Sequence, residues 1–417
     1  MNAKHVCIAF AAAWGAGLCV AQPVQQPAPA DLPSDEIAQR LLRDDPGVVQ
    51  ARHALDAARH RAVALTAGSH EWTAKTWVQR RRDRSTGTDA NEWSVGLERS
   101  LRIGGKAGLD RQLGEAHERL AEARHGEALH EAARELLAQW LDWLVAEQTH
   151  RLWTEQLAFA QDNLKAATSR RQAGDASQLE QNAAVADLAE VQRQLSTAAN
   201  EESKARARLR AHFPALPMDV PLLSEPLPLT GDPGAWREHI LGESDELRIA
   251  KEELRQAELS AARARADRVA DPTLGVHSTS ERAGAERIVG LTLSMPIGGV
   301  ARGSQEREAF QQAEAARAAV MRKQRELEAE IASNQADATG SVERWRFADQ
   351  ALAAGRNNVQ LTQRAYSLGE ADLQTLFLAR RQAVDAALGA AQARLDALRA
   401  RYRLLVDAHL IWGLDHE

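Results

Sequence analysis

The sequence predicts a mainly α-helical fold with a small β part, built as two internal repeats of a helix, a β-hairpin and a long helical hairpin. Two observations carry this prediction. The segment Val95–Ala107 returns 194 residues later as Val289–Ala301, with eight of thirteen positions identical. Each copy is a short strand that ends in two glycines, and a helical pattern of more than sixty residues follows it.

The composition favours long helices and excludes several classes of function. Only 4% of the 417 residues are aromatic and 26% are charged, as in chains whose helices pack like coiled coils. The net charge is −6, so no basic field attracts nucleic acid and no nucleic-acid partner is expected. The local charge run Gln79–Arg84 is interpreted as a solvated loop rather than as a site for polyanions.

Residues 1–21 are typical of a secretory signal peptide. A short basic start precedes the apolar run Val6–Val20, and the small residue Ala21 suits cleavage. No later stretch approaches 18 uncharged apolar residues, so no membrane helix is expected after the signal. An exported chain of this kind is periplasmic, secreted or an outer-membrane β-barrel.

Both cysteines, Cys7 and Cys19, lie inside the predicted signal peptide. The mature chain would therefore have no disulfide, no cysteine–metal site and no cysteine nucleophile. Lipidation of Cys19 is an alternative, although the bulky Leu18 stands where lipoprotein signals have a small residue.

The first repeat is expected over residues 35–212, after a Pro/Gln-rich linker at 22–34 that we expect to be extended or mobile. One helix to about Gly68 precedes a β-hairpin at 71–101, with a polar loop at 80–91. A helical hairpin follows, and its tip lies near residue 174.

The second repeat is expected over residues 236–410, after a Pro-rich linker at 213–235. One helix over 236–269 leads into a β-hairpin at 273–295. A helical hairpin follows from about Ser304, with its tip near residue 369, and residues 411–417 form a C-terminal tail.

The two helical hairpins have almost the same length. Gly105 and Gly174 are 69 residues apart, and Gly299 and Gly369 are 70 residues apart. Because a duplication kept the helix length to within one residue, we expect both tips to reach the same height and to share a functional end.

The strands have the alternation of a two-faced sheet. Each is about nine residues long, enough to cross a hydrocarbon layer when tilted. Alternate residues of the last strand would face lipid: Val289, Leu291, Leu293 and Met295. The residues between them would face a polar interior: Gly290, Thr292 and Ser294. Three tryptophans could anchor the interface: Trp72, Trp77 and Trp93. An ordinary soluble hairpin is the alternative.

One chain supplies only four such strands, whereas a closed barrel needs about eight or more. An open strand edge cannot stand in lipid. The chain is therefore expected to pool strands with copies of itself. Three copies give a 12-stranded β-barrel and a ring of long helices around one axis.

The residues on which these features rest resemble the TolC family of outer-membrane efflux proteins, and within it the CzcC-like heavy-metal branch. The resemblance spans residues 35–410. Leu101–Lys106 (LRIGGK) is similar to the strand ending of that branch, and the tips 171–176 and 366–371 are similar to the tips of the family. Thr375 and Leu378 depart from it, because better-known members have aspartates at these positions.

The resemblance implies a homotrimer whose β-barrel lies among outer-membrane lipid and continues into a periplasmic α-helical barrel. It implies two further partners, a periplasmic membrane-fusion adaptor and an inner-membrane pump of the resistance-nodulation-division (RND) type. The chain would then be the exit duct of a tripartite pump for heavy-metal cations. A drug-efflux or type I secretion duct stays open as an alternative, as does a soluble periplasmic coiled-coil adaptor or scaffold.

Two groups of residues are candidates for function. The resemblance assigns adaptor docking and the aperture to the two tips: Arg171, Gly174, Asp175, Gly369, Glu370 and Asp372. Carboxylates there, together with Glu180, would form acidic rings that favour cations, or would simply stabilise helix starts. Four glycines are interpreted as strand-to-helix bends: Gly104, Gly105, Gly298 and Gly299.

No enzymatic constellation is found, and no cofactor is expected. The glycine pairs lack the spacing of a phosphate loop, and no Gly-x-Ser-x-Gly or His-Glu-x-x-His motif occurs. The helix histidines His117, His125 and His130 are eight and five residues apart, which does not place two ligands on one helix face. No metal site is therefore predicted.

Overall fold

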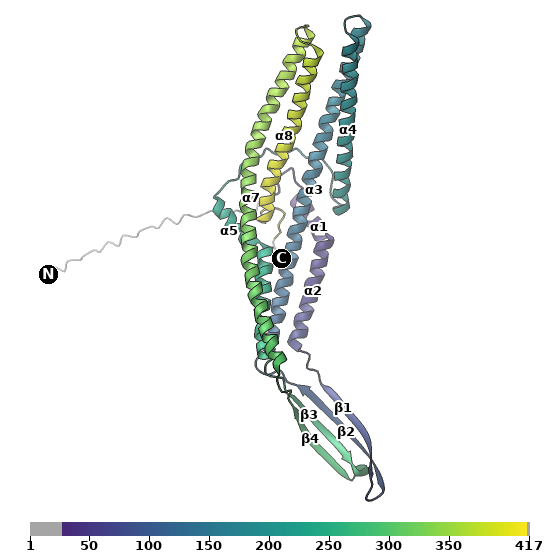
Figure 1. Ribbon diagram of the computed structural model, residues 1–417, viewed down its shortest axis with the longest axis vertical. Helices are drawn as coiled ribbons and strands as arrows, with labels where there is room; N and C mark the ends of the chain where they lie inside the picture. Colours follow the sequence, from purple (N-terminus) through teal and green to yellow (C-terminus); the bar gives the residue numbers. More distant parts are fainter. Residues whose placement is uncertain (1–26, 415–417) are drawn as a thin grey trace, which may run out of the picture.

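The computed structural model describes residues 27–414, which form a long rod with a β-sheet at one end (Figure 1). The predicted signal peptide and residues 415–417 lie outside the described residues. In chain order the elements are α1 (Asp35–Arg43), α2 (Pro46–Ala67), β1 (Thr73–Asp83), β2 (Thr88–Ser100), α3 (Lys106–Gln172), α4 (Gln178–His212), α5 (Pro233–Glu243), α6 (Asp245–Ala266), β3 (Thr273–Glu281), the 3₁₀ turn η1 (Arg282–Gly284), β4 (Glu286–Ser294), α7 (Val300–Ser367) and α8 (Leu373–Asp407).

Each long helix packs against two shorter ones along its length. α4 contacts the half of α3 that is far from the sheet, and α2 contacts the half near the sheet (Figure 1). α8 and α6 pack on α7 in the same way. α3 has 67 residues and α7 has 68, about 100 Å each at 1.5 Å per residue. The predicted fold class is confirmed: a mainly helical chain with a small antiparallel sheet and a duplicated unit.

The four strands form one antiparallel sheet in the order β1-β2-β3-β4. The pairing of β2 with β3, which places Val95 opposite Ser278, joins the two repeats. β1 and β4 are the edges, and neither is paired on its outer side within the described chain.

The predicted polar loop over residues 80–91 is wrong. β1 continues to Asp83 and β2 starts at Thr88, so Arg80 pairs with Asn91 and Arg82 with Asp89. The arginines and aspartates of this stretch suggested a solvated loop. Exposed antiparallel strands also accept charged side chains when opposite charges face each other across a pair, so a charged stretch does not by itself indicate a loop.

The two helices predicted before the hairpins are each broken into two. Pro46 has no N–H to donate, so it starts α2 at its first position, and the Asp45 carboxylate accepts from the Gly47 and Val48 N–H groups at 2.8 and 3.2 Å. In the second repeat the Ser244 hydroxyl accepts from the Leu247 N–H at 3.2 Å and starts α6. α7 begins at Val300, four residues before the predicted start.

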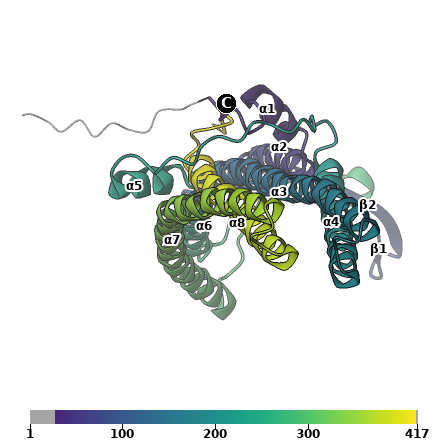
Figure 2. The ribbon, with the colours of Figure 1, turned by 90° about the horizontal axis from the view of Figure 1, so that it is seen from above.

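The main hydrophobic core lies at the middle of the rod. Trp140 and Trp143 of α3 and Tyr402 of α8 are buried there among residues from α1, α5 and the segment between α4 and α5. Seen from above, α1, α5 and the C-terminus lie on one side of the arc of long helices (Figure 2). Within residues 27–414, no helix is both long and apolar enough to span a membrane.

Both ends of the described part of the chain contribute to this core, which corrects two predictions. Leu410, Ile411 and Trp412 are at most 3% exposed, so the start of the predicted C-terminal tail is packed. Asp31, at the end of the linker expected to be mobile, is 1% exposed. Its carboxylate accepts from the Tyr402 hydroxyl at 2.7 Å, and its main-chain carbonyl accepts from the Trp140 indole N–H at 2.8 Å. Burial and this bond raise the pKa of Tyr402.

Candidate functional site

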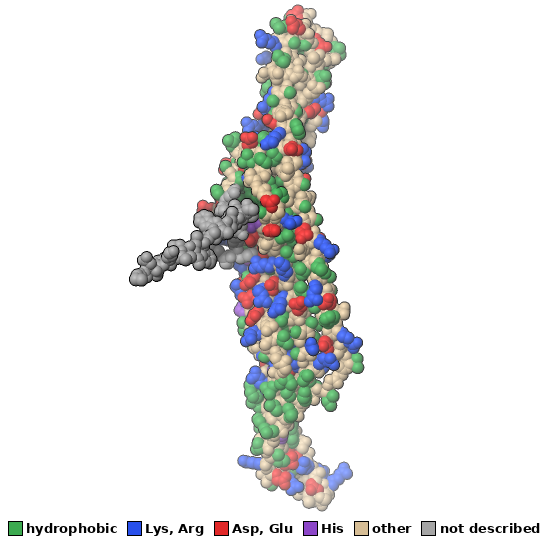
Figure 3. All heavy atoms as spheres, turned by 90° about the vertical axis from the view of Figure 1, so that its left-hand side faces the viewer, with side chains coloured by type: hydrophobic (Ala, Val, Ile, Leu, Met, Phe, Trp, Pro, Cys, Tyr) green, Lys and Arg blue, Asp and Glu red, His purple; other side chains and the backbone are tan. Residues whose placement is uncertain are grey.

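The sheet has one apolar face, although nothing in the described chain covers it. Residues opposite each other in the register share a face, and the shared face carries nine large apolar side chains: Val78, Trp93, Val95, Leu97, Leu274, Val276, Val289, Leu291 and Leu293. We call this set the apolar face. These side chains are between 42% and 85% exposed. Figure 3 shows hydrophobic side chains gathered above a charged end of the molecule.

The other face of the sheet is mainly polar. It carries Glu92, Ser94, Glu98, His277 and Thr279, with Trp77 and Ile288 as apolar exceptions. Glu92 is fully buried, because Gln79 donates to it at 2.7 Å, Arg81 pairs with it at 3.2 Å and the η1 turn lies against β2. The two faces of the sheet therefore differ chemically, one mainly apolar and the other mainly polar.

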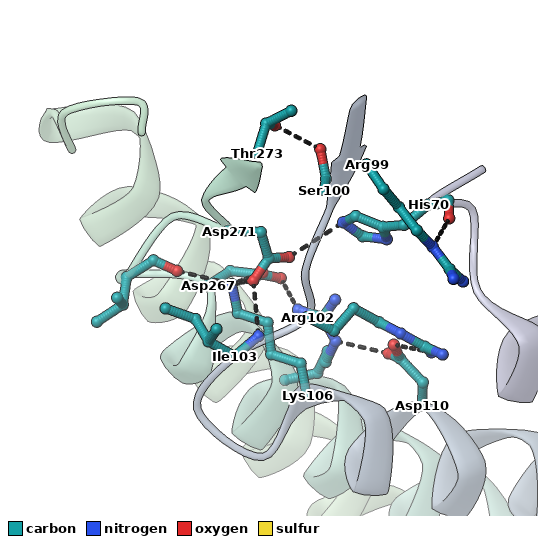
Figure 4. Close-up of polar contacts among 12 residues, drawn as sticks. His70, Arg99, Ser100, Arg102, Ile103, Lys106, Asp110, Asp267, Asp271 and Thr273 are labelled. Atoms are coloured by element: carbon teal, nitrogen blue, oxygen red, sulfur yellow. Dashed lines mark hydrogen bonds and ion pairs between the residues drawn. The ribbon is translucent and has the colours of Figure 1, made fainter. Parts of the chain in front are cut away.

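A network of charged residues joins the sheet to the helices in the first repeat (Figure 4). Lys106, the first residue of α3, is only 1% exposed. Its ammonium group donates to the Val269 carbonyl at 2.6 Å and to the Asp271 carboxylate at 2.8 Å, and it lies 3.3 Å from Asp267. Asp271 also accepts from the Ile103 N–H at 3.1 Å. Lys106 therefore ties the start of α3 to the connection between α6 and β3.

Arg102 holds the end of α2 in the same network. Its guanidinium donates to the carbonyls of Leu65, Thr66 and Ala67 at 3.0, 2.8 and 3.0 Å, which have no partner within the helix. It also pairs with Asp110 at 3.0 Å. A Cβ added at Gly68 would lie 2.6 Å from this guanidinium, so glycine leaves the space that Arg102 fills.

The electrostatics of the network favour its charged state. Burial alone would raise the pKa of Asp271, but the bonds from Lys106 and the Ile103 N–H hold the pKa below its usual value. Burial would likewise lower the pKa of Arg263, but the bonds to Asp110 and Asp267 raise it. Sequence reasoning missed Asp110, Arg263 and Asp271. Asp110 is only five residues beyond Gly105, but Arg263 and Asp271 are more than 150 residues away from it in sequence, and only the fold brings these two to the junction.

The predicted bend glycines behave differently in the two repeats. Gly104 and Gly105 have φ of 67° and 78°, a left-handed conformation that favours glycine, and they connect β2 to α3. Gly298 and Gly299 connect β4 to α7, but Gly299 has an extended φ of −139°. Any residue can adopt this conformation, so the second bend does not require a glycine at position 299.

The two helical tips have the same backbone design. Gly174 and Gly369 have φ of 82° and 75°, and a Cβ at either would meet nothing within 4 Å. The Asp175 N–H donates to the Arg170 carbonyl at 2.8 Å, and the Glu370 N–H donates to the Ala365 carbonyl at 2.9 Å. These bonds close both helix ends in the Schellman manner.

Arginines link the tip segments. The Arg170 guanidinium donates to the Tyr366 hydroxyl and lies 5.4 Å from the centre of the Tyr366 ring, so it connects α3 to α7. Arg171 donates to the Gln181 side chain within its own hairpin. The predicted tip residues are thus brought to one end of the rod, and a residue outside that set, Tyr366, joins the two hairpins.

The tip carboxylates differ in their environment. Asp372 accepts from both the N–H and the hydroxyl of Thr375 at 2.7 Å, so it caps α8, and these bonds lower its pKa. Asp175 and Glu370 are exposed. Asp372 therefore stabilises the start of α8, as one of the two interpretations of these carboxylates predicts. Asp175 and Glu370 remain as exposed carboxylates at the tip.

A groove of about 360 Å³ lies between the hairpins below the tips. Phe159 of α3 and Arg380 of α8 meet in it, with the guanidinium 5.4 Å from the ring centre. Asp187 of α4 also lines the groove. Burial raises the pKa of Asp187, although Arg380 opposes that shift. The groove is therefore lined by both apolar and charged groups.

No metal centre is found among residues 27–414, in which no three His, Cys, Asp or Glu side chains could hold an ion together. Of the helix histidines, His130 lies 3.2 Å from the Asp407 carboxylate in the core, and His117 lies 3.2 Å from the Gln256 amide. These two take part in packing between helices.

No family model and no curated protein matches the sequence. Solved structures do match the fold. CusC, studied for folding and transmembrane channel formation, gives a TM-score of 0.76 at 14% identity, over 89% of this chain and 91% of CusC. A membrane protein from Pseudomonas aeruginosa gives 0.77 at 15% identity, over 96% and 100%. The CmeC outer membrane channel of Campylobacter jejuni gives 0.71 at 14% identity, over 92% and 86%. The chain has the fold of these proteins.

Proposed function

We propose that this chain is a TolC-family protein, one of three identical subunits of an outer-membrane exit duct for a tripartite efflux pump. One observation carries the proposal. A sheet with an apolar face and two unpaired edges continues into a helical rod about 100 Å long. The likeness in fold to CusC and to the CmeC outer membrane channel supports it.

The unpaired edges require a partner in lipid. β1 and β4 each present main-chain N–H and C=O groups on one side, and hydrocarbon offers them no hydrogen bonds. β4 of one subunit pairing with β1 of the next satisfies both. Three copies of the four strands then close a barrel of twelve, with the apolar face toward lipid and the polar face toward the lumen.

The opposite end of the rod would meet the pump. Gly174 lies in the α3–α4 turn and Gly369 in the α7–α8 turn, and both are exposed. These two turns lie at the end of the rod far from the sheet (Figure 1). A periplasmic membrane-fusion adaptor would dock there, and it would connect the duct to an RND pump in the inner membrane. The chain itself would perform no chemistry on its cargo.

For the cargo we propose heavy-metal cations, because Leu101–Lys106 is similar to the metal-pump branch. In the structure Arg102 and Lys106 hold the junction together. The motif therefore supports a metal cargo only through its similarity to that branch, because its side chains have a structural role here. The exposed carboxylates Asp175 and Glu370 at the aperture carry the negative charge that favours cations.

Membrane fractionation and native mass measurement test the duct. We expect outer-membrane protein that detergent extracts as a trimer. A monomer that stays soluble without detergent would contradict the duct and favour the periplasmic scaffold. Deletion of the gene should raise sensitivity to zinc, cobalt or cadmium. If sensitivity to drugs alone rises, the metal cargo is wrong and the duct stands.

Gly369→Trp tests docking at the tip. The bulky side chain should raise metal sensitivity while trimer levels stay normal. Gly87→Trp is the matched control, because Gly87 has a similar φ of 72° and open space around it but lies in the β1–β2 turn at the far end. Equal sensitivity of the two variants would argue against docking at the tip.

A further inference from the structure

The charge run Gln79–Arg84 has a place in the sheet that its sequence did not reveal. Arg80 and Arg82 lie in β1, two and four residues beyond Val78, and therefore on the same side of the sheet as the apolar face. Their side chains are 71% and 76% exposed. On this side of the sheet, the apolar face therefore ends in exposed arginines.

A third arginine joins them from another strand. Arg287 of β4 lies in the same row as Val78 and Trp93, through the pairings of Trp93 with Ser280 and of Ser280 with Arg287. It is exposed. We call Arg80, Arg82 and Arg287 the arginine rim. Arg287 is level with the last apolar row, and at about 3.4 Å per residue Arg80 and Arg82 lie about 7 and 14 Å beyond it.

The two faces of the sheet differ in charge at this height. On the polar face Arg81 pairs with Glu92 at 3.2 Å and with Glu281 at 3.5 Å, and Arg282 in η1 pairs with Glu286 at 2.7 Å. On the arginine rim a single carboxylate, Asp89, serves both Arg80 at 2.6 Å and Arg82 at 3.8 Å. The positive excess therefore lies only on the side of the apolar face.

We propose that the arginine rim binds phosphate groups of anionic lipid headgroups in the outer leaflet. The inference rests on the proposed function, which places the apolar face in the outer membrane. Guanidinium groups bind phosphate oxygens through paired, charge-assisted hydrogen bonds. A lipid alone presents a phosphate directly above an acyl chain, and the sheet presents arginines directly beyond apolar side chains. Nucleic acid or an acidic protein would leave the adjoining Val78 and Trp93 without an apolar partner.

The experiment is a lipid titration of the detergent-purified protein, followed by native mass spectrometry. The probes are phosphatidylglycerol, lipid A and, as the neutral reference, phosphatidylcholine. We expect the anionic lipids to bind more tightly, and added salt to weaken them. An arginine near an anionic lipid surface contributes about a factor of five, so Arg80→Gln/Arg82→Gln/Arg287→Gln should weaken anionic lipid binding on the order of 100-fold.

Two matched variants control for shape and charge. Arg282→Gln removes an exposed arginine at the same end but from η1, on the polar side, and should bind the lipids like the wild type. The triple Lys variant keeps the charge and should retain most of the affinity. If the triple Gln variant does not fold, Arg287→Gln alone should weaken binding about fivefold.

Several results would overturn the inference. Wild-type affinity in the triple Gln variant, equal affinity for phosphatidylcholine, or tighter binding of a short DNA oligonucleotide than of lipid would each do so. A trimer that sits in the outer membrane and exports cargo, but shows one of these results, would leave the duct intact. Absence from the outer membrane would overturn both proposals.

Discussion

The two strand-to-helix junctions began as copies of one motif, and the structure gives them opposite characters. In the first repeat Arg102 and Lys106 form a buried network with acidic partners. The positions 194 residues later are Pro296 and Val300, and neither carries a charge. Lys106 is 1% exposed, whereas Val300 is 84% exposed.

Strand position explains the difference. The first junction follows β2, a central strand, so the connection between α6 and β3 lies beside it and supplies Asp267 and Asp271. The second junction follows β4, an edge strand, and within one described chain nothing lies on its outer side. Under the proposed trimer the exposed Ile297 and Val300 would pack on the next subunit. The duplicated motif therefore kept its order of strand, glycine pair and helix, but its bend conformation and its side chains diverged according to their neighbours.

Replacing the charge at the first junction should produce the largest effect. Lys106→Met leaves the partly buried Asp271 without the ammonium group that pairs with it at 2.8 Å, and it should lower the free energy of unfolding by about 3 kcal/mol. The matched Val300→Met should change it by less than about 0.5 kcal/mol. The melting temperatures of the purified proteins measure both. Equal losses would contradict the asymmetry of the junctions.

A double variant, and measurements at low pH, test the same ion pair between Lys106 and Asp271. Lys106→Met/Asp271→Leu removes both charges and should recover part of the loss. Because Asp271 has a lowered pKa, its contribution is present above its ordinary value of 3.8 and is lost as the pH falls through that region. The wild type should therefore lose stability below about pH 4 more steeply than the double variant.

A smaller effect is expected at Glu127 of α3, whose counterpart 194 residues later is the exposed Met321. Burial, with repulsion from Glu246, raises the pKa of Glu127 from 4.5 to about 7. Its stabilising contribution is full below pH 4.5 and is lost as the pH rises through 7. At pH 8 Glu127→Gln should be more stable by about 1 kcal/mol, with allowance for partial exposure.

Melting curves at pH 5 and pH 8 would check this prediction. The Gln variant should differ from the wild type mainly at the higher pH. Met321→Gln should be neutral at both, because that position is half exposed and neither side chain titrates. If the gain in stability from Glu127→Gln did not grow with pH, ionisation of the Glu127 carboxylate would not destabilise the folded protein, and the prediction would be wrong.

The tips should show an effect about as small as that of Glu127→Gln, and no asymmetry. Gly174→Ala and Gly369→Ala place a Cβ on residues with φ of 82° and 75°, so each should cost about 1 kcal/mol through backbone strain alone. Thermal melting of the two variants measures this cost. A much larger loss at one tip would mean that the two tips do not share one backbone design.

Parts of the architecture were readable because they repeat. The return of Val95–Ala107 and the 69- and 70-residue spans between glycines predicted two equal helical hairpins. The period-two pattern of the last strand predicted which of its residues lie together on the apolar side of the sheet. Pro46 could have predicted the start of α2, because proline at a first helical position after Asp is a common signal.

The sequence by itself determined the repeat, the long helices and the two-faced strands, since these depend on periodicities along the chain. Only the tertiary structure decided that Lys106 meets Asp271, that Arg80 and Arg287 share a face, and that Trp412 closes the core beside Asp35. These pairs are separated by more than 150 residues. Coulomb and packing interactions depend on distance in space, which no local pattern encodes.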